Sequence, residues 1–135
     1  MNVNPPEDRI EGLRIFVVED EAVIAMALED LLADLGCTVV DVAGTLSQAM
    51  DRVEAMASEA DGAILDVNLG GEKSYPVADA LHRLAMPFFF TTGYDPSSLD
   101  EPYRAMQILA KPVHRAALAG ALNELRDRRA RDGLP

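Results

Sequence analysis

The residues Ala63-Ile64-Leu65-Asp66-Val67-Asn68-Leu69-Gly70-Gly71 form the stretch that decides the fold. A short apolar run bounded by turn residues is typical of a buried strand, and this run ends at the carboxylate of Asp66. Ligands bind at the carboxyl ends of the strands in a parallel sheet, so Asp66 is well placed for chemistry. An Asp at such a point can also do no more than begin a turn. The positions of the other carboxylates decide between these two interpretations.

Composition argues against several classes of protein. The chain has 135 residues, which is enough for one domain with a core of ordinary size. Its net charge of −11 argues against a nucleic acid or an anionic membrane as partner, because phosphate groups would repel this surface. The single cysteine, Cys37, cannot form an internal disulfide, and neither a signal-peptide pattern nor an apolar run of membrane-spanning length is present. We therefore expect a soluble, cytoplasmic protein.

Apolar runs alternate with helical patterns along the chain, and several runs are apolar throughout. This alternation predicts an α/β fold, a doubly wound five-stranded parallel sheet with helices on both faces and right-handed crossovers. The expected strands are 15–18, 38–40, 63–65, 88–90 and 106–109.

The segment between the fourth and fifth strands breaks this alternation. It contains Pro96 and Pro102 and no clean apolar stripe, so we expect a shortened or irregular fourth helix. We expect a flexible N-terminal tail over 1–12, one domain over 13–126 and a frayed C-terminal end over 127–135.

Polar residues follow the strands at the edge where all the strand ends meet. Glu19 and Asp20 follow the first strand, Asp66 the third, Thr92 the fourth and Lys111 the fifth. Clustered carboxylates raise one another's pKa unless a cation lies among them, and hard oxygen ligands suit Mg²⁺, or the similar Mn²⁺. A lysine and a threonine hydroxyl supply the positive charge and the hydrogen-bond donor that a phosphoryl group needs. A carboxylate can itself be the nucleophile in phosphoryl transfer.

The chain resembles the receiver domain of bacterial two-component response regulators over residues 13–126. The matching residues are Val17-Val18-Glu19-Asp20-Glu21, Leu65-Asp66-Val67-Asn68, Thr92-Gly93 and Lys111-Pro112. The resemblance implies a flavodoxin-like sheet of order 2-1-3-4-5. The run from Phe90 to Tyr94 also resembles the F-x-T-G-Y motif of a group of stand-alone receivers, known as the "FAT GUY" group.

The same resemblance assigns a role to each residue at this edge. Asp66 would be the phosphoacceptor, and Thr92 and Lys111 would contact the phosphoryl oxygens. Asp20 and Asp66 would bind the metal directly, the backbone carbonyl of Asn68 would be a further ligand, and Glu19 would bind through water. The implied function is a single-domain response regulator rather than an enzyme, with only self-catalysed phosphotransfer and aspartyl-phosphate hydrolysis.

Two departures from the receiver pattern concern how phosphorylation would be read out. Gly70 stands where the pattern often has proline, and Ile108 stands where it usually has an aromatic residue. We therefore expect that phosphorylation pulls Thr92 inward, that Gly93 and Tyr94 move with it, and that residues 94–105 become ordered. The alternative is that Tyr94 packs over the edge of the sheet and the loop is static.

The partner implied by the resemblance is a sensor histidine kinase or a phosphotransfer protein. Helical spacing places Met26 away from the core stripe, so that it faces solvent beside Ala22 and Ala25, and Pro112 follows the site lysine. We expect these residues to form a docking surface for a helical partner.

With no output segment after residue 126, the signal would pass to a downstream protein by contact, or the chain would drain phosphate from a kinase. Two alternatives stay open. The first is a pseudo-receiver that docks without being phosphorylated. The second is a flavodoxin-like module for a small ligand, which is disfavoured because no Gly-rich phosphate loop follows the first strand.

Overall fold

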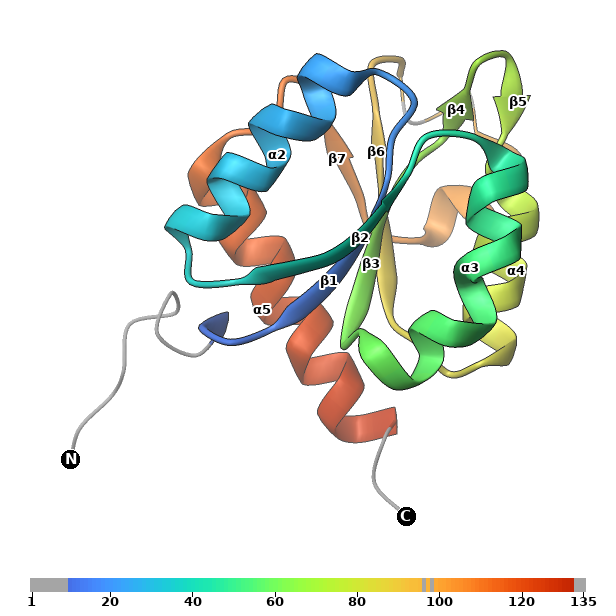
Figure 1. Cartoon of the computed structure of the whole chain (residues 1–135). Helices are drawn as coiled ribbons and strands as arrows, with labels where there is room; N and C mark the ends of the chain where they lie inside the picture. The colour runs from blue at the N-terminus through green and yellow to red at the C-terminus, as the bar shows by residue number, and fades with distance from the viewer. Residues whose placement is uncertain (1–9, 96, 98, 133–135) are drawn as a thin grey trace, which may run out of the picture.

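The central sheet is parallel and has the strand order β2-β1-β3-β6-β7 (Figure 1). It is seen in a computed structural model that describes residues 10–95, 97 and 99–132. This order confirms the predicted doubly wound, flavodoxin-like fold. The strands are β1 (Arg14–Val18), β2 (Thr38–Ala43), β3 (Gly62–Asp66), β6 (Phe88–Thr92) and β7 (Ile108–Ala110).

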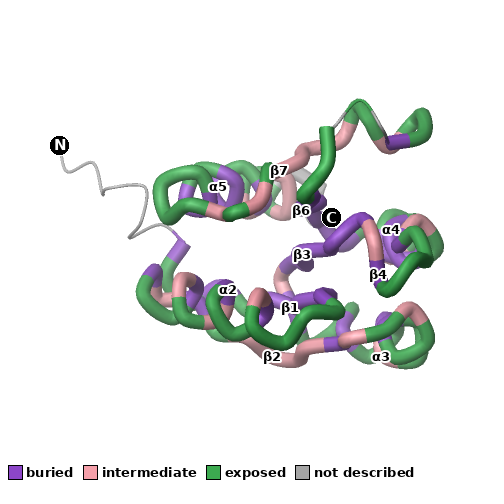
Figure 2. Tube along the Cα trace, turned by 90° about the horizontal axis from the view of Figure 1, so that it is seen from above, coloured by how far each residue is buried: buried purple, intermediate pink, exposed green. Residues whose placement is uncertain are grey.

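Two layers of helices cover the sheet, one on each face. Viewed from above, α2 and α5 lie on one side of the strands and α3 and α4 on the other (Figure 2). None of the helices in the described ranges is both long enough and apolar enough to cross a membrane. The helices are α2 (Ala22–Asp34), α3 (Leu46–Glu59), α4 (Tyr75–Arg83) and α5 (Arg115–Asp132).

The strands bury both of their faces, which is why they read as continuous apolar runs. Val17 and Phe89 pack into a core with α2 and α5, whereas Phe16 and Phe90 pack into a second core with α3 and α4. All four side chains are at most 1% exposed. Burying a side chain of this size contributes roughly 1.5–3 kcal/mol, so the alternation fixes which way every strand faces.

Between β6 and β7 the described residues contain 3₁₀ geometry, including the turn η2 (Tyr103–Ala105), but no α-helix, which confirms a shortened fourth helix. This segment is nevertheless held against α4. The rings of Tyr75 and Tyr103 stack at 3.9 Å, the Tyr103 hydroxyl donates to Asp79 at 2.7 Å, and the Asp100 backbone N–H donates to the Tyr75 oxygen at 3.0 Å. Leu99 is 3% exposed and adds an apolar anchor. Aromatic and apolar contacts thus replace the missing helix.

A two-stranded hairpin follows β3 directly. Its strands are β4 (Asn68–Leu69) and β5 (Glu72–Lys73), which pair antiparallel. Gly70 and Gly71 form the turn between them with φ of +59° and +94°. A two-residue turn with both φ values positive matches the twist of antiparallel strands and favours glycine at both positions.

At the N-terminus, the packed domain begins earlier than predicted. Residues 1–9 lie outside the described residues, but Ile10, inside the expected tail, is fully buried. Its carbonyl accepts from the Leu13 N–H at 3.1 Å, and the Gly12 N–H donates to the Gly36 carbonyl at 2.8 Å. Burial of Ile10 against α2 and α5 accounts for the difference.

The C-terminal helix is longer than predicted. Fraying was expected from residue 127, yet α5 continues to Asp132. The Arg128 guanidinium donates to the Phe88 carbonyl, and Arg129 forms an ion pair with Asp61 at 3.3 Å. These contacts hold the last turns of α5 against the amino edge of the sheet, at which the strands begin.

Candidate functional site

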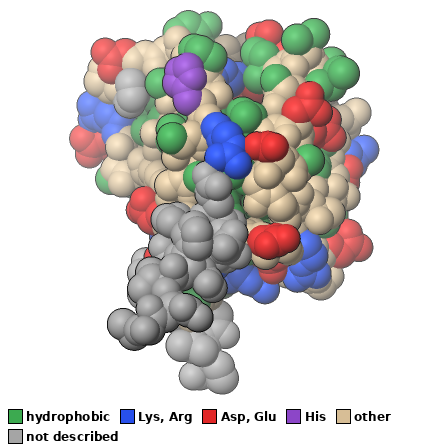
Figure 3. Space-filling view, turned by 90° about the vertical axis from the view of Figure 1, so that its left-hand side faces the viewer, with side chains coloured by type: hydrophobic (Ala, Val, Ile, Leu, Met, Phe, Trp, Pro, Cys, Tyr) green, Lys and Arg blue, Asp and Glu red, His purple; other side chains and the backbone are tan. Residues whose placement is uncertain are grey.

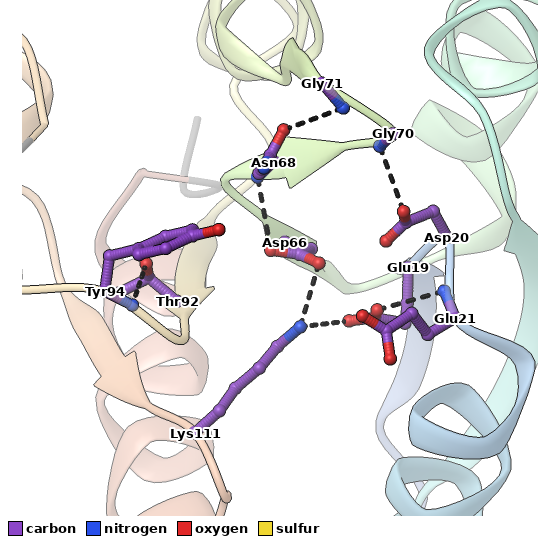
Figure 4. A network of polar contacts seen from close by, with 10 residues as sticks. All are labelled: Glu19, Asp20, Glu21, Asp66, Asn68, Gly70, Gly71, Thr92, Tyr94 and Lys111. Atoms are coloured by element: carbon purple, nitrogen blue, oxygen red, sulfur yellow. Dashed lines mark hydrogen bonds and ion pairs between the residues drawn. The ribbon is translucent and has the colours of Figure 1, made fainter.

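The predicted site residues meet at the carboxyl edge of the sheet. Glu19 and Asp20 follow β1, Asp66 is the last residue of β3, Thr92 is the last residue of β6 and Lys111 follows β7. Parallel strands end at one edge, so residues that are up to 92 positions apart in the sequence lie side by side there (Figure 4). The fold therefore brings together what the sequence distributes over four strand ends.

Three carboxylates form a cluster at this edge. Oxygen atoms of Glu19, Asp20 and Asp66 all lie within 4.8 Å of one another. Glu19 and Asp66 are 3% and 6% exposed, whereas Asp20 is open to solvent. An oxygen donor set with one exposed member fits a hard divalent cation such as Mg²⁺, which keeps several of its waters.

Lys111 lies between the two buried carboxylates. Its Nζ donates to Glu19 Oε2 and to Asp66 Oδ2, both at 2.8 Å. Burial alone would lower the pKa of Lys111, but the hydrogen bonds to Asp66 and Glu19 outweigh it and raise that pKa. The lysine is therefore held in its charged form beside the Asp66 carboxylate.

One lysine does not fully balance these carboxylates. Burial raises the pKa of Glu19 to about 7, the Lys111 hydrogen bond opposes this rise, and the charge of Asp66 adds to it. A cation bound among the carboxylates would favour their charged forms. Keeping these carboxylates charged therefore costs free energy, and a bound metal ion would offset that cost.

Residues at the carboxyl ends of β3 and β6 form the walls of the site. The Asn68 backbone N–H donates to Asp66 Oδ1 at 3.2 Å, and Thr92 Oγ1, which is almost fully buried, accepts from the Tyr94 N–H at 3.0 Å. Tyr94 itself is 62% exposed. A cavity of about 360 Å³ opens above Asp66, and its lining includes Asp20, Asn68, Tyr94 and Lys111.

The other two residues proposed for the switch are Gly93 and Ile108. Gly93 is exposed and lines the same cavity. Ile108, in β7, is half-buried against the core that contains Phe90. An isoleucine thus occupies the fifth-strand position as the sequence predicts, and the movement expected of it stays a prediction.

The predicted docking residues divide into exposed and buried ones. Met26 is 62% exposed, and Ala22 and Pro112 are also exposed. Ala25 is only 5% exposed, because it lies three residues before Leu28 and shares the buried face of α2. It still lines a surface hollow beside Met26, and its part in docking stays a prediction.

Sequence reasoning missed one contact within the site. The Gly70 backbone N–H donates to Asp20 Oδ2 at 3.0 Å, so the β4–β5 hairpin touches the acidic cluster. The signal that could have revealed the hairpin is the Gly70-Gly71 pair, which is typical of a two-residue hairpin turn. The partner of its N–H lies 50 positions away and follows only from the fold.

Comparison with known proteins assigns the family. The chain matches the response regulator receiver domain family over residues 15–123. It is 34% identical over 115 residues to the phyllosphere-induced regulator PhyR of Methylorubrum extorquens, covering 82% of this chain and 42% of PhyR. The chain therefore spans about two fifths of the length of that curated relative.

Solved structures agree with this assignment. The solution structure of SdrG from Sphingomonas melonis Fr1 is 46% identical, with a TM-score of 0.74, and the match covers 84% of this chain and 96% of SdrG. The BeF3-activated conformation of SdrG from Pseudomonas melonis Fr1 is also 46% identical, with a TM-score of 0.73 and coverage of 85% and 98%. From its fold, its acidic cluster and these matches, the chain belongs to the response regulator receiver domain family of two-component signalling.

Proposed function

We propose that this receiver domain accepts a phosphoryl group on Asp66 from a histidine kinase or a phosphotransfer protein. The observation that supports this most directly is the position of the Asp66 carboxylate, which lies beside the Lys111 ammonium and opens into the cavity at the carboxyl edge. In the transfer, an Asp66 oxygen attacks phosphorus, a P–O bond forms and the P–N bond of the phosphohistidine breaks. The electron pair of that bond stays with the imidazole, which leaves neutral when its second nitrogen carries a proton.

The surrounding residues have separate tasks in this proposal. Lys111 leaves its bridging position to contact the phosphoryl oxygens, and the Thr92 hydroxyl donates to another of them. Asp20 and Asp66 would hold Mg²⁺ or Mn²⁺ directly, the Asn68 carbonyl would be a further ligand, and Glu19 would act through water. A metal ion bound there would supply positive charge that offsets the charge developing on the phosphoryl oxygens.

We also propose that the donor protein docks over α2 and the connection from β7 to α5. An apolar groove of about 420 Å³ runs between them and opens beside Glu19 and Lys111. Val23, which is 79% exposed, lines this groove, and Met26, which is 62% exposed, lines a second hollow on α2. The face of the molecule that carries α2 and α5 shows hydrophobic side chains along its upper part (Figure 3). A helix that carries the phosphohistidine could lie there with its reactive ring near Asp66.

The output proposed for this chain is contact with a downstream protein or the draining of phosphate from a kinase. The structural relative SdrG has a BeF3-activated conformation, which supports a switchable receiver rather than a pseudo-receiver that only docks. The presence of Asp66, Thr92 and Lys111 at one edge supports the same choice. Membership of the F-x-T-G-Y group stays a prediction.

The test is incubation with a small phosphodonor, with and without Mg²⁺, followed by intact-mass measurement. We expect one phosphoryl addition that requires Mg²⁺ and is lost in Asp66→Asn, because an amide cannot act as the attacking oxyanion. Equal labelling of the wild type and Asp66→Asn would end the proposal.

A further inference from the structure

We infer that the β4–β5 hairpin positions Asp20 for cation binding through the backbone N–H of Gly70. This inference rests on the proposed phosphoacceptor site. It assigns a role to the β4–β5 hairpin, to which the proposed function gives none. The Gly70 N–H lies 3.0 Å from Asp20 Oδ2. In Figure 4, this oxygen is turned to the hairpin, and the other oxygen of Asp20 is turned toward Asp66.

The hairpin is anchored at its other end by the phosphoacceptor itself. The Asn68 N–H donates to Asp66 Oδ1 at 3.2 Å, the Asn68 side-chain oxygen accepts from the Gly71 N–H at 3.0 Å, and Leu69 is 3% exposed in the core. The hairpin therefore links Asp66 to Asp20 by backbone hydrogen bonds across the mouth of the cavity. Its tip holds the exposed carboxylate of the cluster in one orientation.

This arrangement leaves one oxygen of Asp20 free to face a cation. A ligating carboxylate that is fixed by an outer hydrogen bond loses less freedom when the metal binds, and removing such a partner typically costs about 10–100-fold in affinity. Linkage is reciprocal, so a cation on Asp20 must in turn stabilise the hairpin by the same free energy. Cation affinity and the order of residues 68–73 are thus coupled.

The positive φ at Gly70 limits which substitutions the turn can accept. No atom lies within 4 Å of a Cβ placed at Gly70, so size alone is tolerated, but its φ is +59°. Asparagine adopts this left-handed conformation readily, whereas a β-branched residue does not. Gly70→Asn should keep the turn and its N–H in place, and Gly70→Val should displace them. Gly12, with φ of +88° and equally open surroundings at the opposite edge of the sheet, is a matched control for strain.

The experiment is a Mn²⁺ titration in which the electron paramagnetic resonance signal of the free ion measures binding. It is carried out on the wild type and on the variants Gly70→Asn, Gly70→Val and Gly12→Val. We expect Gly70→Val to bind about tenfold or more weakly. Gly70→Asn should stay within about threefold of the wild type, because it retains the turn and the N–H. Gly12→Val should match the wild type. Wild-type affinity in Gly70→Val, or equal losses in Gly70→Asn or Gly12→Val, would overturn the inference.

Hydrogen exchange of the wild type tests the same coupling without any substitution, in case Gly70→Val fails to fold. Added Mg²⁺ should slow exchange of the backbone amides of residues 68–73 more than those around Gly12. Unchanged exchange in the hairpin would contradict the inference. A wild type that binds no Mn²⁺ would instead remove the proposed metal site, whereas binding that is lost in Asp20→Asn but kept in Gly70→Val would overturn the positioning role alone.

Discussion

The two ends of the sheet each carry a charged cluster, and these clusters differ in how well their charges are balanced. At the amino edge, Asp61 accepts from the Arg14 backbone N–H at 2.8 Å and from the Arg14 guanidinium at 3.0 Å, and Arg129 lies 3.3 Å away. At the carboxyl edge, Glu19 and Asp66 share Lys111. The first cluster offers two cations to one carboxylate, and the second offers one cation to two buried carboxylates.

This difference appears directly in the pKa values. Burial alone would raise the pKa of Asp61, but the hydrogen bonds from the side chain and backbone of Arg14 outweigh it and lower that pKa. Burial raises the pKa of Glu19 to about 7 despite Lys111. A balanced cluster stabilises the fold, whereas an unbalanced one is arranged to receive further positive charge. The imbalance of charge, rather than the number of charges, distinguishes the carboxyl edge from the amino edge.

The largest expected effect is on the response to metal. Asp20→Asn should abolish the increase in melting temperature that Mg²⁺ produces, and it should melt higher than the wild type without Mg²⁺ because repulsion is relieved. Asp61→Asn is the control and should keep the full Mg²⁺ response. Thermal unfolding of both variants at several Mg²⁺ concentrations measures this. An unaltered Mg²⁺ response in Asp20→Asn would mean that the carboxylates are not ligands.

The matching change at the amino edge should act in the opposite direction. Asp61→Asn leaves Arg14 and Arg129 without their carboxylate, so we expect it to destabilise the fold by about 1 kcal/mol, the order expected for hydrogen bonds at a partly exposed ion pair. Denaturant unfolding with and without Mg²⁺ gives this value. Stability equal to that of the wild type would show that the amino edge is not a structural cluster.

Much of this contrast could be predicted from the sequence. Apolar runs that end at Glu19, Asp66 and Thr92 predict both the sheet and the edge at which these residues meet, because parallel strands place their ends together. The burial of Ala25 is less clearly marked in the sequence. Its spacing from Leu28 and Leu32 places it on their buried face of α2, but a small side chain adds little to the apolar pattern by which that face is recognised.

Contacts made across the fold were also beyond sequence reasoning. The Tyr75 and Tyr103 stack and the Gly70 contact with Asp20 join segments that are 28 and 50 positions apart, and no local pattern marks such pairs. The burial of Ile10 is similar, since a single apolar residue after a polar stretch carries no periodicity. Local pattern therefore predicts elements and strand ends, and tertiary packing determines the rest.

A smaller effect should be seen in the dependence of stability on pH. Because the pKa of Glu19 is raised in the fold, the metal-free native state binds more protons than the unfolded state between about pH 4.5 and pH 7. The free energy of unfolding should therefore decrease, by an amount on the order of 1 kcal/mol, as the pH rises through this window. The decrease should be smaller in Glu19→Gln.

Asp61 should give the reverse dependence. Its pKa is lowered, so its contribution is present above the ordinary value of 3.8 and is lost as the pH falls below it. Urea unfolding from pH 3 to pH 8 in a chelator measures both effects. A slope between pH 5 and pH 7 that is the same in Glu19→Gln and the wild type would contradict the imbalance at the carboxyl edge.

The rate of transfer from a partner protein should change less, because a single substitution alters only one residue of the docking surface. Met26→Glu should slow transfer from the cognate phosphodonor protein by about threefold to tenfold, in keeping with the loss of roughly 1 kcal/mol at an interface. Labelling by a small donor should be unaffected. Met50→Glu is the control, since Met50 is 39% exposed on α3 and lines neither the groove nor the hollow beside Met26. If transfer and small-donor labelling fall together, Met26 serves the fold and not the interface.

The smallest effect is expected in the segment after β6. A phosphoryl mimic should draw Thr92 inward and slow hydrogen exchange around Tyr94, whose N–H donates to Thr92 Oγ1. The gain over residues 99–105 should be slight, because Leu99 and the Tyr75–Tyr103 stack already hold them. Exchange that does not change near Tyr94, or the same response in Tyr94→Ala, would favour a static loop.

The most direct test of the account is to locate the phosphoryl group. After labelling with a small phosphodonor and Mg²⁺, borohydride reduction converts a phosphorylated aspartate to homoserine, and peptide mass spectrometry finds the position. We expect homoserine at residue 66, none at residue 61, and none anywhere when Mg²⁺ is removed. Homoserine at residue 61, or labelling of Asp66 that is equally fast in a chelator, would contradict the claim that the unbalanced edge is the functional one.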